Sequence, residues 1–151
     1  WELHMTSTFP EVRIKRTIEV RGADCVSHEL AIAFCALFTG LLYDDTALSE
    51  GLELAQELGQ YGSRDERFAT ACQLGLQGRF INASGSASIR ELASRLVQVG
   101  AEGLERYQPH NRDLIAPLEA QIARGCSPAM DLINAWQSNP TPEHVIDFLS
   151  Y

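Results

Sequence analysis

One short segment near the amino end, residues 13–21, constrains the fold more than any other part of the chain. Its side chains alternate as in a β-strand, with Arg13, Lys15, Thr17, Glu19 and Arg21 on one face and Ile14, Arg16, Ile18 and Val20 on the other. A strand cannot satisfy its backbone hydrogen-bonding groups alone, so another strand must pair with it. The polar face suits the binding of phosphates and carboxylates, and a solvent-facing edge strand would give the same alternation.

The remainder of the chain has helical patterns. Ser27 is placed to cap a helix that starts near His28, and because this helix is apolar nearly all round, we expect it to be central and buried. Thr46 or Ser49 would start the next helix, after an Asp44–Asp45 pair that fits a turn or a cap. Between residues 75 and 88 the composition turns to Gly, Asn and Ser, which predicts a loop.

Three prolines mark later helix boundaries. Pro117 falls inside an apolar helical pattern over residues 112–124 and predicts two short pieces there. Ser127 followed by Pro128, and Thr141 followed by Pro142, are each a cap with proline at the first helical position. The sequence therefore predicts a mainly α fold, with one amino-terminal β-strand followed by about seven helices.

Composition excludes some classes of partner. The formal net charge is −8, from 12 Lys+Arg against 20 Asp+Glu, so we expect no nucleic acid partner, because phosphate-backbone binding needs a basic surface. No apolar run approaches the roughly 20 residues of a membrane span, and we expect no membrane partner. With 45% hydrophobic and 21% charged residues, the composition is that of a soluble globular chain.

The four cysteines are scattered and form no Cys-x-x-Cys pair. Cys35 and Cys72 fall on apolar helical faces and are interpreted as small core residues. Cys25, at the end of the strand segment, is the best candidate for a reactive thiol, and nothing in the spacing of Cys126 indicates a partner.

Five segments carry a family resemblance. Residues 4–24, 40–44, 103–106, 123–129 and 148–151 resemble, in the same order, segments of glutamate–cysteine ligases of the plant and proteobacterial type. The first of these segments is the most specific, and in that family it forms one strand of the active-site sheet. The resemblance implies a strand that belongs to a larger active-site sheet, and an α+β fold for the complete enzyme.

The resemblance also implies the chemistry. The family joins the γ-carboxylate of glutamate to the amine of cysteine with ATP and Mg²⁺, the first step of glutathione biosynthesis. In this sequence Glu19 would bind magnesium and Arg21 would act on the transferring phosphoryl group. Substrate contacts would come from four further residues of the segment: Arg13, Lys15, His4 and Thr6. The partners would be glutamate, cysteine, ATP and the remainder of the same enzyme, in the cytoplasm, or in a plastid if the source is a plant.

The extent of the chain leaves alternatives open. Family members are several times longer, and this chain opens without an initiator methionine, so we expect residues 1–151 to be a single domain or a carboxy-terminal fragment that is inactive alone. Residues 1–27 would be its active-site strand segment and residues 28–151 its helical region. A non-catalytic helical binding or scaffold module would also explain the strand. So would a related ligase with a different amine acceptor, which the departure from the family pattern at residues 25–29 favours.

Overall fold

The computed structural model describes residues 12–14, 16–23 and 26–150. The elements in chain order are β1 (Val12–Ile14), β2 (Ile18–Val20), α2 (His28–Tyr43), α3 (Asp45–Leu58), α4 (Arg64–Leu74), η1 (Gly75–Gln77), β3 (Arg79–Asn82), β4 (Gly85–Ser88), α5 (Ile89–Tyr107), η2 (Pro109–Ile115), α6 (Ala116–Arg124), α7 (Pro128–Ser138) and α8 (Pro142–Leu149). Seven α-helices in this described part, with a few short strands, confirm the mainly α fold.

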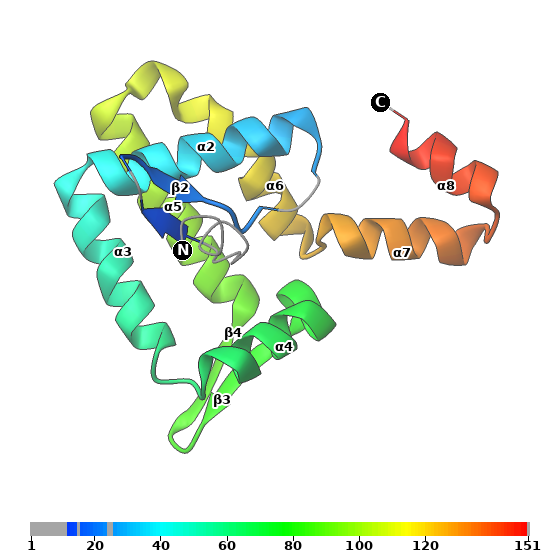
Figure 1. The fold of residues 1–151 in the computed structure, drawn as a ribbon, viewed down its shortest axis with the longest axis horizontal. Coiled ribbons are helices and arrows are strands. Elements are labelled where there is room, and N and C mark those ends of the chain that lie inside the picture. The colour runs from blue at the N-terminus through cyan, green and yellow to red at the C-terminus, as the bar shows by residue number, and fades with distance from the viewer. Residues whose placement is uncertain (1–11, 15, 24–25, 151) are drawn as a thin grey trace, which may run out of the picture.

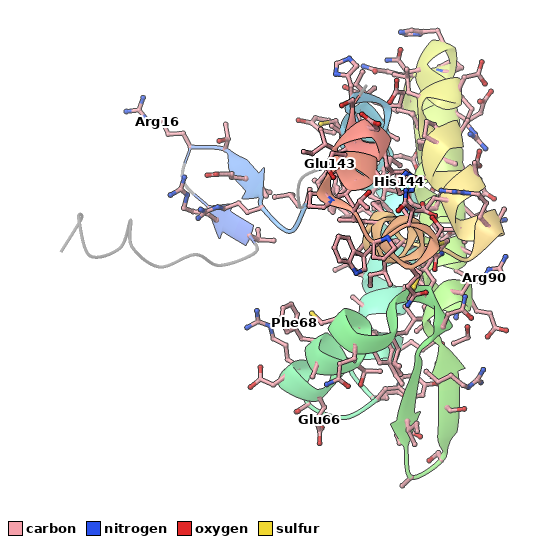
Figure 2. The ribbon with its side chains drawn as sticks, turned by 90° about the vertical axis from the view of Figure 1, so that its right-hand side faces the viewer. Arg16, Glu66, Phe68, Arg90, Glu143 and His144 are labelled. Atoms are coloured by element: carbon pink, nitrogen blue, oxygen red, sulfur yellow. The ribbon has the colours of Figure 1, made fainter. Side chains whose placement is uncertain are left out.

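The amino-terminal strand segment is a hairpin, and the prediction of one continuous strand over residues 13–21 was wrong. The chain reverses between Ile14 and Ile18, so that β1 and β2 pair antiparallel with Arg13 opposite Glu19. Reversal lets the segment satisfy part of its own backbone hydrogen bonding, which a lone strand cannot do. Figure 2 shows this hairpin standing away from the helices, whereas in Figure 1 it overlaps α2 and α5 in projection.

The core lies where α2 and α5 cross (Figure 1). Its buried members come from these two helices and from the end of η2: Ala36, Leu37, Leu41, Val97, Ala101, Leu104 and Ile115. Glycines allow the two helices to touch, because a Cβ on Gly40 would overlap the carbonyl oxygen of Gly100. A Cβ on Gly103 would lie 2.6 Å from the Cβ of Ala47 on α3. The helices are thus in backbone contact at the centre of the molecule.

Helix starts follow the sequence signals in most places. Ser27, Ser127 and Thr141 cap α2, α7 and α8, as predicted. The expected start of α3 at Thr46 or Ser49 was wrong, because Asp44 caps it by accepting a hydrogen bond from the backbone N–H of Ala47 at 2.8 Å. The predicted break near Pro117 is confirmed: η2 ends at Ile115, and the proline occupies the first turn of α6.

Three expectations about burial and loops were wrong. The helix α2 is not buried all round, because Cys35 and Ile32 are exposed; Cys72 on α4 is exposed as well. Residues 75–88 are not a loop but η1 followed by the β3–β4 hairpin. Its turn is closed by the side chain of Asn82, which accepts a hydrogen bond from the Ser84 N–H at 2.8 Å, and by Gly85 at φ 156°.

The carboxy-terminal helices α7 and α8 extend away from the α2–α5 crossing as an arm (Figure 1). Within the described residues, no single helix meets the length and apolarity needed to cross a membrane; α2 and α3 meet that test only together, and they are bent by 101° to each other.

Candidate functional site

The polar face of the amino-terminal hairpin gathers the candidate residues that the structure describes. Glu19 on β2 lies opposite Arg13 on β1, and Arg21 follows two residues later on the same face. Arg13 donates to Oε2 of Glu19 from Nε at 2.8 Å and from Nη2 at 2.5 Å. Nε of Arg21 lies 3.6 Å from Oε1 of the same carboxylate. The predicted sharing of one face by these three side chains is therefore confirmed, with Glu19 between two guanidinium groups.

The cluster of Arg13, Glu19 and Arg21 is accessible to solvent and contains two guanidinium groups and one carboxylate. The exposed fractions of the three side chains are 27%, 44% and 23%. Guanidinium groups bind carboxylates and phosphates with two parallel hydrogen bonds. The arrangement can hold a carboxylate or a phosphoryl group at the open side of the hairpin.

Arg16 adds a cation that the sequence pattern placed on the apolar face. It lies in the bend between the strands, and Figure 2 shows its side chain pointing outward from the hairpin tip. The alternation rule applies only within a strand, so a bend inside the pattern removes its basis for assigning a face. The three described arginines of this hairpin are thus a local basic region in an acidic chain.

The hairpin does not by itself supply a metal site. Among the described residues no group of three or more His, Cys, Asp or Glu side chains is arranged to hold a metal ion. Glu19 is the carboxylate of the cluster, and its Oε2 is engaged by Arg13. Magnesium prefers several oxygen ligands in an octahedral arrangement, so further ligands would have to come from outside this cluster.

Several candidates lie outside the described residues. These are His4, Thr6 and Lys15, which were assigned to substrate binding, and Cys25, which was the candidate thiol.

The helical part carries polar contacts of a different kind, which tie helix ends together. Arg106 on α5 binds both carboxylate oxygens of Asp44, with Nη2 at 2.8 Å from Oδ1. This hydrogen bonding holds the pKa of Asp44 below its ordinary value. Arg90, labelled in Figure 2, donates to the carbonyl oxygens of Ile122 and Ala123 at the end of α6. These groups satisfy helix termini.

A family profile described as Glutamate-cysteine ligase family 2 (GCS2) matches residues 1–147, which includes the hairpin and the helices up to α8. The chain belongs to this family. The resemblance found in the sequence is thereby confirmed.

Curated relatives agree with the family. "Glutamate--cysteine ligase A, chloroplastic" from Oryza sativa subsp. indica is 31% identical over 138 residues, which are 91% of this chain and 27% of that protein. "Glutamate--cysteine ligase, chloroplastic" from Medicago truncatula is 28% identical over 153 residues, 100% of this chain and 29% of that protein. The corresponding protein of Arabidopsis thaliana is 29% identical over 136 residues, 90% of this chain and 25% of that protein. The GCS2 chain thus spans about a quarter of the length of the curated relatives it matches.

Proposed function

We propose that this GCS2 chain is part of an ATP-dependent ligase that joins the γ-carboxylate of glutamate to the amine of cysteine, the first step of glutathione biosynthesis. The observation that carries the proposal is the family match over residues 1–147, in which the basic hairpin is included. The names of the relatives specify a glutamate–cysteine ligase. The short share of their length supports the view that residues 1–151 are one part of a longer enzyme. We propose that they are its carboxy-terminal part, with the remainder of the enzyme as partner.

The proposed reaction explains why guanidinium groups stand on the hairpin. A carboxylate is a poor electrophile, so its oxygen first attacks the γ-phosphorus of ATP, which gives an acyl phosphate and releases ADP. The cysteine amine then attacks the acyl carbon, and inorganic phosphate leaves with the C–O bond electrons. Both steps move negative charge over several oxygens, which fixed cations stabilise.

We assign roles to the hairpin residues on this basis. Arg21 holds the transferring phosphoryl group, and Arg13 binds a substrate carboxylate. Further contacts to the substrates come from Lys15, His4 and Thr6. Glu19, besides fixing the two arginines, contributes one ligand oxygen to magnesium, which supplies charge neutralisation when bound with ATP. The remaining ligands belong to the remainder of the enzyme.

The alternatives make different predictions for the same protein. A scaffold module would leave the turnover of the complete enzyme nearly unchanged when Glu19 or Arg21 is substituted. A ligase with another acceptor would consume ATP with glutamate and a different amine. The compartment, which is chloroplastic in the names of the relatives, is proposed to be a plastid or the cytoplasm.

The proposal is tested by incubating the purified complete enzyme with ATP, magnesium, glutamate and a panel of amines. We expect ADP release that depends on glutamate, and γ-glutamyl amide formation that is fastest with cysteine. Absence of glutamate-dependent ADP release would overturn the proposal. Residues 1–151 alone should form no product, because one carboxylate is too few for the metal site.

The role of Glu19 is tested by titrating magnesium against the Glu19→Gln variant. The amide keeps the shape and removes the charge, so the magnesium concentration for half-maximal rate should rise. Glu53→Gln, an exposed change on α3, is the matched control and should leave the titration unchanged. An unchanged titration in Glu19→Gln would limit Glu19 to positioning the arginines.

A further inference from the structure

The helix α2 has an outer face that is apolar and yet exposed. This outer face comprises the neighbouring positions Ala31, Ile32, Cys35, Thr39, Leu42 and Tyr43. Ile32 is 36% exposed, Leu42 39% and Tyr43 65%. Between Glu29 and Asp44 the helix contains no charged residue at all. An ordinary surface helix has charged or polar side chains on the face turned to water, and a helix apolar all round is a buried one.

The hydroxyl group of Thr39 on this face already has a hydrogen-bond partner within the protein. The Oγ1 atom of Thr39 donates a hydrogen bond to the backbone carbonyl of Cys35 at 2.9 Å, within the helix itself. Every other side chain of the outer face is hydrocarbon, thiol or aromatic. A protein surface can therefore cover this face if it offers one hydrogen-bond partner, for the hydroxyl group of Tyr43.

The hairpin next to α2 in the chain has the same property. Its apolar side chains are exposed, Val12 at 50%, Ile14 at 77% and Ile18 at 60%. The helices of this chain therefore do not cover Ile14 and Ile18. An isolated two-stranded hairpin is marginally stable in water. Contacts on its apolar face and hydrogen bonds along its strand edges would therefore stabilise it. Residues 21–27 join this hairpin to the start of α2.

We propose that one body covers both surfaces: the part of the same ligase that this chain does not span, whose apolar side chains lie on the outer face of α2 and on the exposed apolar side chains of the hairpin. This inference rests on the proposed function. It commits to that occupant because the chain spans only 27% of the rice relative, so most of the length of such an enzyme remains to be placed.

The cysteines provide an internal test, because Cys35 lies on the outer face of α2 and Cys72 lies on α4, and both are exposed here. In the complete enzyme, each thiol is labelled with iodoacetamide, and the extent of labelling is followed by mass spectrometry. The labelling rate of each thiol in the folded enzyme is then divided by its labelling rate in the enzyme unfolded in urea. We expect Cys35 to be slowed roughly tenfold or more relative to Cys72, because buried thiols are inert. Equal relative rates for the two thiols would overturn the proposal.

The same labelling separates the occupants. Protection of Cys35 that is lost on dilution to nanomolar enzyme would assign the outer face to a second copy of the chain. Protection that arises only with phosphatidylcholine vesicles would assign it to a lipid surface. Either result contradicts the proposal, which expects protection independent of concentration and of vesicles. Because labelling needs no turnover, an inactive enzyme with a protected Cys35 would overturn the proposed function alone.

A pair of charge substitutions gives a second readout. Ile32→Glu would place a charge under the covering body and should lower the melting temperature of the complete enzyme by several degrees. The control is Leu52→Glu on α3, where the side chain shares its face with Asp45, Ser49 and Gln56 and stays in water. Equal melting temperatures for the two variants would show that the outer face of α2 is not covered.

Discussion

The helical body, formed by α2, α3, α5, η2 and α6, and the amino-terminal hairpin are held by different interactions. In the body, Gly40 and Gly100 bring two helices into backbone contact, and Leu104 and Ile115 are almost completely buried. In the hairpin, Ile14 and Ile18 are exposed, and the side chains in closest contact are charged, with Arg13 and Arg21 around Glu19. Close packing of helices holds the helical body together, and a cluster of charged side chains provides the closest side-chain contacts in the hairpin.

Under the proposed function, this difference separates the residues that stabilise the fold from those that act in the reaction. A single added methyl group can destabilise the helical body, because a tightly packed interior has no room for it. Exposed ion pairs in the hairpin contribute little to stability, and in the proposed function their guanidinium groups bind a substrate anion. Substitutions in the two regions should therefore move different measurements.

The largest effect on stability is expected for Gly40→Ala. The added methyl group would overlap the Gly100 carbonyl and force α2 away from α5, so the free energy of unfolding should fall by about 3 kcal/mol or more. The matched control is Gly51→Ala on α3, where the nearest atom to the new methyl group is 3.5 Å away. That change should raise stability by about 0.5–1 kcal/mol through helix propensity. Urea denaturation of both variants measures the difference, and a neutral Gly40→Ala would refute the described crossing.

A smaller, pH-dependent effect is expected for Asp44→Asn. Asparagine keeps the cap of α3 but loses the ion pair with Arg106. Because the hydrogen bond from Arg106 lowers the folded-state pKa of Asp44, the charged form stabilises the fold above the ordinary pKa of about 4, and this contribution is lost as the pH falls through the folded-state value. The melting temperature of the variant should be a few degrees low at pH 7, and this deficit should shrink as the pH falls below about 4. A deficit independent of pH would contradict the ion-pair explanation, and Asp45→Asn is the neighbouring control.

The smallest effect on stability is expected in the hairpin. A double-mutant cycle of Arg13→Ala and Glu19→Ala should give a coupling energy of about 0.2–1 kcal/mol, because both side chains are partly exposed. A coupling above about 2 kcal/mol would mean that the cluster is structural and would erase the contrast with the helical body.

The sequence predicts the local features well because they depend on neighbouring residues. Ser27, Ser127 and Thr141 cap helices in the structure because each side chain reaches backbone N–H groups within its own turn. Pro117 ends a helical pattern because its ring fits the first turn of α6 and not an interior position.

Features that depend on distant parts of the chain were not predicted. Alternation is the same in one long strand and in two paired strands, so the reversal before Ile18, and with it the ion pair between Arg13 and Glu19, could not be inferred. Apolar spacing placed Cys35 on an apolar face but could not show what covers that face. The turn at residues 82–85 was assigned to a loop because its small polar residues suit a hairpin turn equally well.

The central claim is that the hairpin carries the chemistry, and turnover of the Arg21→Lys variant in the complete enzyme tests it most directly. Lysine keeps the charge but cannot reproduce the planar fork of the guanidinium group, and loss of such a transition-state contact commonly costs roughly 10²–10³ in turnover. We predict a loss of that size in the formation of γ-glutamylcysteine and ADP, with a melting temperature within about a degree of the parent. Near-normal turnover in Arg21→Lys would contradict the account.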